Sequence, residues 1–121
     1  SKTKALKNIA YGSHPQQAMD VYFPTQPLTD KTPAPLIVMV HGGAWIIGDK
    51  NKAAVVKNKM DYWNKQGWVF ISINYRLVPD ATLQQQTQDI AEALIYIQNQ
   101  APNWHADSKR LVLMGHSAGA H

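Results

Sequence analysis

The sequence predicts an α/β fold in which helices flank a mostly parallel sheet. Three short apolar runs, at 36–40, 68–73 and 111–114, have the length and composition of strands that are buried on both faces. Between them lie two longer stretches whose apolar residues recur every three or four positions, as they do on one face of a helix. Such alternation of strands and helices is typical of a parallel sheet with right-handed crossovers.

The first third of the chain is expected to supply two strands separated by a loop. Residues 18–23 form a short stretch that Pro24 ends, and we expect a strand there. Four prolines fall within 24–35, and this composition indicates an exposed loop. The strand at 36–40 is continuously apolar, so it is expected to be covered on both faces.

A helix is expected before the strand at 68–73. Val56, Met60 and Trp63 are spaced i, i+4 and i+7, so they share one helical face. Gly67 then provides the residue type that commonly ends a helix, because glycine adopts a left-handed conformation without steric cost.

A second helix is expected before the strand at 111–114. Its apolar stripe advances by alternating steps of four and three residues and comprises Leu83, Thr87, Ile90, Leu94 and Ile97. Asp89 falls outside this stripe and is expected to be exposed to solvent. Pro102 lies beyond the end of the helix, and residues 107–108 (Asp-Ser) are expected to form a turn.

A serine between two glycines follows the last predicted strand. Residues 115–119 are Gly-His-Ser-Ala-Gly, which has the G-x-S-x-G spacing of a nucleophile elbow. At a sharp strand-to-helix turn the serine backbone is strained and bulky neighbours would clash. Glycines two residues before and after the serine remove those clashes and leave its hydroxyl accessible. Ser117 is therefore the candidate nucleophile.

A second glycine motif, His-Gly-Gly-Ala-Trp at 41–45, follows the strand at 36–40. Acyl transfer places negative charge on a carbonyl oxygen, and N–H groups in a loop free of large side chains stabilise that charge. Alone, either glycine motif also fits an ordinary turn at the end of a strand. Their joint occurrence, each after a strand of buried type, favours an oxyanion loop paired with a nucleophile.

With these motifs the chain resembles the α/β-hydrolase superfamily, specifically the esterases related to hormone-sensitive lipase and the feruloyl-esterase and kynurenine-formamidase-like group. The resemblance extends from about residue 20 to the last residue and rests on the stretches 20–24 (Asp-Val-Tyr-Phe-Pro), 41–45, 48–50 (Gly-Asp-Lys), 74–79 (Asn-Tyr-Arg-Leu-Val-Pro) and 115–121. It implies an α/β-hydrolase fold and a hydrolase that needs no metal or cofactor.

The resemblance also implies roles for individual residues. Ser117 Oγ would attack the substrate carbonyl carbon and form an acyl-enzyme. The backbone N–H of Ala118 would donate one hydrogen bond to the oxyanion, and the N–H groups of Gly42, Gly43 and Ala44 would donate the others. Alanine at the third position of the loop leaves that backbone donor intact.

Four further side chains are candidates for shaping the pocket or bracing its loops: His41, Trp45, His116 and Tyr75. His41 opens the oxyanion loop and is expected to fix it, whereas His116 flanks the nucleophile. Trp45 either shapes the pocket or packs in the core. The resemblance implies that Tyr75 and its neighbour Arg76 brace the loops around the site.

The rest of a catalytic triad is expected outside this sequence. In the superfamily the serine is followed along the chain by an Asp or Glu and then by a histidine, whereas this chain of 121 residues ends shortly after Ser117. His121 would lie one helical turn beyond the serine, beside the helix rather than over the hydroxyl, and is rejected as the base. Residues 1–121 are therefore expected to be the N-terminal half of a single α/β-hydrolase domain.

Composition excludes several other classes of protein. Hydrophobic residues make up 45% and charged residues 17%, so a packed core is expected rather than disorder. The formal net charge is +4, but no recognised nucleic-acid motif accompanies the lysines, and no nucleic acid is expected as a partner. The chain has no cysteine and no apolar stretch of membrane-spanning length. Localisation stays open, with the cytoplasm slightly favoured.

The sequence thus predicts a carboxylesterase acting on a small or aromatic acyl ester. The alternatives are an arylformamidase-like amide hydrolase, a non-catalytic binding protein of the same fold, and an inactive fragment. Because the strand at 111–114 would lack its next neighbour, we expect the chain to associate with a polypeptide that carries the remaining half, or with itself. Without acid and histidine, the chain alone is expected to be inactive.

Overall fold

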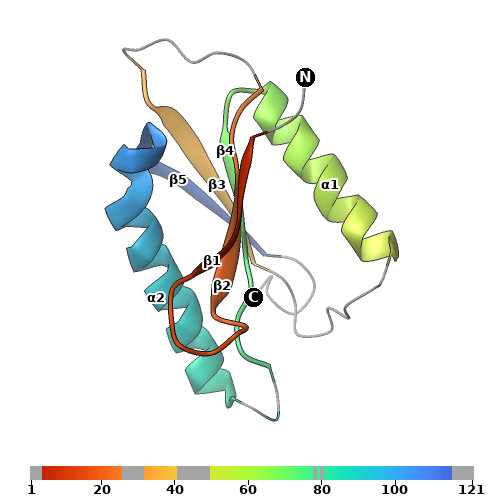
Figure 1. Cartoon of the computed structure of the whole chain (residues 1–121), viewed down its shortest axis with the longest axis vertical. Helices are drawn as coiled ribbons and strands as arrows, with labels where there is room; N and C mark the ends of the chain where they lie inside the picture. Colours follow the sequence, from red (N-terminus) through yellow and green to blue (C-terminus); the bar gives the residue numbers. More distant parts are fainter. Residues whose placement is uncertain (1–3, 26–31, 41–49, 78, 80, 116–121) are drawn as a thin grey trace.

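A five-stranded sheet forms the middle layer of the structure, with one long helix on each face (Figure 1). The computed structural model describes residues 4–25, 32–40, 50–77, 79 and 81–115, with the backbone alone for 50–55. The elements in chain order are β1 (Ala5–Ala10), β2 (Ala18–Tyr22), β3 (Ala34–Val40), α1 (Lys50–Lys65), β4 (Val69–Ile73), α2 (Leu83–Gln100), the short 3-10 helix η1 (Ala101–Trp104) and β5 (Ala106–Gly115).

The strand order β1-β2-β4-β3-β5 makes the sheet mixed. β3 runs parallel to both β4 and β5, which confirms the predicted parallel part of the sheet. β1 and β2 form an antiparallel hairpin, and β2 is also antiparallel to β4. The α/β fold class is confirmed, with an antiparallel hairpin added at one side.

β1 is a strand that the sequence pattern did not predict. Its pairing with β2 shifts register between Leu6 and Ile9, and Asn8 lies within this irregularity at φ 54°, in the left-handed region. The Asn8 N–H donates to Asp20 Oδ1 at 2.8 Å. A bulge of this kind interrupts the two-residue alternation by which a strand is recognised in sequence.

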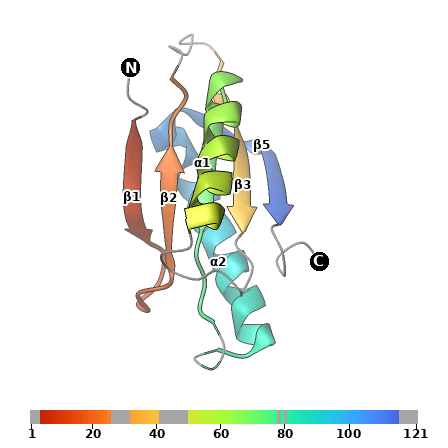
Figure 2. The same cartoon turned by 90° about the vertical axis from the view of Figure 1, so that its right-hand side faces the viewer.

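The helices α1 and α2 cover opposite faces of the sheet, as Figures 1 and 2 show from two directions. The chain passes from β3 through α1 to the neighbouring β4, and then from β4 through α2 back across β3 to β5. Crossovers between parallel strands are right-handed, so reversing the direction of travel along the sheet places the second helix on the other face.

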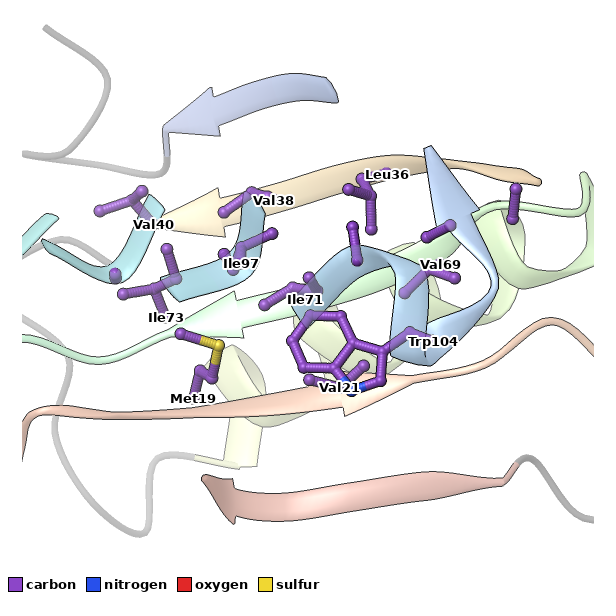
Figure 3. Close-up of a cluster of buried hydrophobic side chains, with 14 of the residues drawn as sticks. Met19, Val21, Leu36, Val38, Val40, Val69, Ile71, Ile73, Ile97 and Trp104 are labelled. Atoms are coloured by element: carbon purple, nitrogen blue, oxygen red, sulfur yellow. The ribbon is translucent and has the colours of Figure 1, made fainter. Parts of the chain in front are cut away.

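The central strands divide their side chains between two cores. The core beneath α2 takes alternate residues of β3 and β4: Leu36, Val38, Val40, Val69, Ile71 and Ile73. Ile97 of α2 and Trp104 of η1 pack against them (Figure 3). On the other face Ile37, Met39 and Phe70 form the core beneath α1. The prediction of strands covered on both faces is confirmed for β3 and β4, and their burial fixes the sheet that carries the loops. It is wrong for the run at 111–114, because Val112 and Leu113 of β5 are 45% and 50% exposed.

The first helix and its end are confirmed. Val56, Met60 and Trp63 pack together against the core beneath α1, as their spacing predicts. The helix stops at Lys65, and Gly67 follows at φ 88°. Glycine is the residue type that adopts this left-handed conformation most readily, so it lets the chain turn from α1 into β4.

The second helix is present, and Ile90, Leu94 and Ile97 of the predicted stripe pack in or against the core beneath α2. Leu83, the first residue of that stripe, is 78% exposed. The buried positions of α2 are Asp89, Ala93 and Ile97, four residues apart. The prediction that Asp89 is exposed is therefore wrong: its carboxylate lies in the interior, where Arg76 neutralises it.

The predicted turn at residues 107–108 is also wrong, because both residues belong to β5. Asp107 Oδ1 accepts a hydrogen bond from the Lys109 N–H at 2.9 Å, which is a local contact typical of turns. The pairing of β3 with β5 shifts register nearby, between Ala34 and Leu36. The strand thus contains a hydrogen bond typical of turns, and its pairing is locally irregular there.

Candidate active site

The carboxyl ends of β3, β4 and β5 lie at one edge of the sheet, here called the carboxyl edge. Their last residues are register partners, since Val40 pairs with Ile73 on one side and with Gly115 on the other. Neighbouring strands are about 4.8 Å apart, so the chain leaves the sheet at three adjacent points. Ligands of open α/β sheets bind in the crevice outside this edge, which makes it the candidate site.

Both glycine motifs begin at the carboxyl edge. The stretch His-Gly-Gly-Ala-Trp starts directly after Val40, the last residue of β3. Gly115, the last residue of β5, is also the first residue of Gly-His-Ser-Ala-Gly. The two strands lie side by side with the same direction, as Figure 2 shows. The strand that a nucleophile elbow requires in front of it is therefore present.

Most of the site residues that the sequence indicates lie outside the described residues, and their roles stay predictions. They are His41, Gly42, Gly43, Ala44, Trp45, His116, Ser117 and Ala118. Tyr75 is described. It is 7% exposed and belongs to the core beneath α2, and burial raises the pKa of its phenol. Its ring thus anchors the segment that follows β4.

An ion pair holds this same segment. Arg76 Nε donates to Asp89 Oδ2 at 2.9 Å, and Arg76 Nη2 donates to Asp89 Oδ1 at 2.8 Å. The backbone N–H of Arg76 also donates to Oδ2, at 3.0 Å. Gln17 Nε2 adds a donor to Oδ1 at 2.9 Å. Because Asp89 is 0% exposed, these groups replace the water that its charge would otherwise require.

The pKa of Asp89 lies below its ordinary value. Burial alone would raise this pKa, because it penalises the charged form, but hydrogen bonds from the Arg76 side chain and backbone and from Gln17 outweigh it. The hydrogen bond to Asp89 also raises the pKa of Arg76. Both side chains are therefore charged at neutral pH, so the pair holds structure rather than exchanging protons.

Sequence reasoning missed Asp89 and Gln17 as residues that act near the site. The sequence does contain a signal for Asp89, namely its spacing. Asp89 lies four residues before Ala93, which lies four residues before Ile97, so the three share the buried face of the helix. A carboxylate on such a face requires a cationic partner. Gln17 has no comparable signal, since it lies in a turn and contacts a helix distant in the chain.

Two kinds of feature are absent from the described ranges. No group of three or more His, Cys, Asp or Glu side chains there is arranged to hold a metal ion. Among the described helices, none combines the length and apolar character that crossing a bilayer requires.

Along nearly its whole length, the chain is similar to known esterases and to a formamidase. The family model BD-FAE matches residues 19–121. The probable isoprenylcysteine alpha-carbonyl methylesterase of Oryza sativa subsp. japonica is 31% identical over 118 residues, which is 98% of this chain. Kynurenine formamidase of Salmo salar is 26% identical over 118 residues, again 98% of this chain. The crystal structure of esterase B from Lactobacillus Rhamnosis superimposes with a TM-score of 0.79 at 31% identity and covers 97% of this chain.

These proteins are considerably longer than the present sequence. The chain spans 27% of the methylesterase, 37% of the formamidase and 36% of esterase B. The similarity to esterase B confirms the α/β-hydrolase fold, and the family model accounts for most of the chain. The chain therefore belongs to the BD-FAE family of α/β-hydrolase esterases.

Proposed function

We propose that the protein containing this chain is a carboxylesterase that forms an acyl-enzyme on Ser117. The observation that carries the proposal is the pairing of Val40 with Gly115. Because of this pairing, the loop at 41–45 and the serine motif follow strand ends that lie side by side. A nucleophile and its oxyanion donors must both lie about 3 Å from the reacting carbonyl group. Motifs that left the sheet at opposite edges could not meet this requirement.

In the proposed reaction, Ser117 Oγ attacks the carbonyl carbon of the ester while a histidine takes its proton. The resulting oxyanion accepts hydrogen bonds from the N–H groups of Ala118, Gly42 and Gly43, with Ala44 as a further donor. The tetrahedral intermediate then collapses and releases the alcohol, which takes the proton from the histidine. Water, deprotonated by the same histidine, then releases the acid from Ser117. Each oxyanion donor contributes about 3–4 kcal/mol to stabilising the transition state.

The acid and the histidine of this mechanism are proposed to lie outside residues 1–121, which would form the N-terminal half of the domain. The methylesterase and esterase B, of which the chain spans 27% and 36%, have length for both groups beyond the matched part. The active species is then a longer polypeptide or a complex with a second polypeptide. The chain alone is expected to be inactive.

A small or aromatic acyl ester is the proposed substrate. The methylesterase and esterase B, each 31% identical to the chain, support an ester as the substrate. An N-formyl arylamide is the second candidate, because kynurenine formamidase of Salmo salar is 26% identical. The two classes are distinguished by the ratio of kcat/KM for an aryl ester and for an N-formyl arylamine. We expect the ester to be preferred, with His41, Trp45 and His116 bracing or lining the pocket.

The proposed nucleophile is tested by intact-mass spectrometry after treatment with a fluorophosphonate. Esterase B has a phosphonate-inhibited form, so a phosphonate probe suits this family. In the complete protein we expect a phosphonyl adduct in the wild type and none in Ser117→Ala. The 13.5 kDa chain alone is expected to stay unmodified. Equal labelling of both variants, or no labelling of the complete wild-type protein, contradicts the proposal.

A further inference from the structure

The segment that follows β4, residues 74–77, has no regular secondary structure, yet much of its backbone is hydrogen-bonded. The Asn74 N–H donates to the carbonyl of Ala18 at 2.9 Å. The Asn74 carbonyl accepts from the hydroxyl of Tyr11 at 2.5 Å. Buried backbone groups outside helices and sheets require such partners, and here they are provided by the N-terminal hairpin.

Two further residues of the segment are held in the same way. The Arg76 N–H donates to the carboxylate of Asp89, which Gln17 also contacts. The Leu77 N–H donates to Gln16 Oε1 at 3.2 Å. Three side chains of the turn between β1 and β2 thus hold the segment, either directly or through Asp89.

The turn itself, residues 11–17, is tightly constrained. Gln17 Oε1 accepts from the His14 N–H at 3.0 Å, and the Gln17 N–H donates to the His14 carbonyl at 2.8 Å. The Gln16 N–H donates to His14 Nδ1 at 3.1 Å. At Gly12 an added Cβ would lie 2.3 Å from Gln17 Oε1, so a larger residue there would displace the end of the Gln17 side chain. These contacts fix the directions in which the two glutamines project.

The held segment leaves the sheet beside the proposed site. It follows Ile73, the register partner of Val40, and Val40 precedes the loop at 41–45. The segment therefore starts on one side of β3 at the carboxyl edge, and β5 with the serine motif lies on the other side. Loops at this edge form binding sites when a rigid scaffold positions them.

We propose that the turn at 11–17 is a positioning element for the esterase site. Through Gln16, Gln17 and Tyr11 it holds residues 74–77 as a fixed wall beside the end of β3, from which the loop at 41–45 starts. The three side chains are positioning residues, since they act through the segment rather than on the substrate. The inference rests on the proposed function, because it assigns the wall to the site that contains Ser117. A displacement of about 1 Å at such a site can lower the rate on the order of a hundredfold.

Gln16 offers the sharpest test, because it is only half-buried and its truncation leaves the core intact. Gln16→Ala removes the acceptor of the Leu77 N–H, whereas Gln16→Glu retains an oxygen at that place. Ser13→Ala is the matched control, since Ser13 is exposed in the same turn. For each variant of the complete protein we would measure kcat and KM for ester hydrolysis, the melting temperature, and amide hydrogen exchange at Leu77.

We expect Gln16→Ala to lower kcat/KM on the order of tenfold and to accelerate exchange at Leu77. Gln16→Glu should restore both quantities, and Ser13→Ala should match the wild type, as should all melting temperatures to within a few degrees. Wild-type kinetics in Gln16→Ala, or equal losses in Gln16→Ala and Gln16→Glu, would overturn the inference. A complete wild-type protein that neither hydrolyses esters nor takes up the phosphonate overturns the proposed function instead, and this inference with it.

Discussion

At the scale of single residues, Asp89 connects more of the described structure than its position in the sequence suggests. Its carboxylate accepts hydrogen bonds from Arg76, which follows β4, and from Gln17, which precedes β2. It therefore joins the N-terminal hairpin, the segment at the carboxyl edge and α2. A buried carboxylate is tolerated because each of these contacts is charge-assisted.

Replacing Asp89 is expected to destabilise the fold, because the Arg76 guanidinium would lose its charged partner. Removing one member of a buried pair costs about 3–5 kcal/mol. The Arg76 side chain keeps 23% exposure, so we expect Asp89→Asn to lower the free energy of unfolding by an amount near the lower end of that range. Denaturant unfolding measures the change. Gln98→Ala, which changes an exposed side chain on the same helix, is the control and should change stability by less than about 0.5 kcal/mol.

The stability difference between the wild type and Asp89→Asn should depend on pH in a defined direction. The pKa of Asp89 is lower in the folded than in the unfolded chain. Its contribution to stability is thus complete above the unfolded pKa of about 4 and is lost as the pH falls through the folded pKa. The stability difference between wild type and Asp89→Asn should be constant from about pH 7 to pH 5 and shrink below about pH 4. A difference that grows on acidification contradicts this assignment.

At the scale of secondary-structure elements, the end of α1 depends on the conformation of one glycine. Gly67 has φ 88°, and an added Cβ would meet no heavy atom within 4 Å. The cost of Gly67→Ala is therefore conformational and should lower the free energy of unfolding by about 1–2 kcal/mol. Gly67→Asn should cost less, because asparagine tolerates the left-handed region. Denaturant midpoints for the three proteins check the order, and an alanine variant as stable as the wild type contradicts it.

The elements that could be predicted from sequence are those whose local pattern agrees with the final packing. β3 is apolar throughout and β4 is apolar except for Ser72, because both faces of each strand are covered, so their composition alone identified them. β1 escaped prediction because the bulge at Asn8 breaks its alternation. The predicted face of α2 was right for Ile90, Leu94 and Ile97 but missed the buried Asp89, because hydrophobic periodicity cannot place a charged residue.

The candidate site also has parts that could be predicted from the sequence and parts that could not. The two glycine motifs could be recognised because their chemistry depends on short, fixed spacing within one loop. The resemblance also indicated a bracing role for Tyr75 and Arg76, but the partners that hold residues 74–77 could not be predicted, because they are distant along the chain. Gln16 is 61 residues from Leu77, and Gln17 is 72 residues from Asp89. Side-chain contacts at such separations follow from the fold, and no local spacing encodes them.

At the scale of the whole molecule, β5 leaves an apolar edge on the described sheet. It is the last strand in the order, and its Val112 and Leu113 are 45% and 50% exposed. An exposed apolar edge strand pairs readily with another polypeptide. We therefore propose that the chain associates through β5, either with a polypeptide that carries the remaining half of the domain or with a second copy.

Sedimentation velocity tests this association directly. The 13.5 kDa chain is expected to form larger species, and Leu113→Lys should shift the distribution toward monomer by placing a charge on the edge. Leu83→Lys is the matched control, because Leu83 is also exposed but lies on α2, and it should sediment like the wild type. A monodisperse wild-type monomer contradicts the proposal.

The pairing of Val40 with Gly115 also sets the order in which the molecule can assemble during synthesis. β3 lies between β4 and β5 in space but precedes both along the chain. Its partner on the β4 side emerges from the ribosome first, and its other side stays unpaired until residue 115 has been made. Pairing across such a long sequence separation is slow, because the intervening chain must first be ordered. The crevice in which we place the chemistry is therefore expected to be among the last features of this segment to form, and a nascent chain that stops before β5 lacks the strand that leads to Ser117.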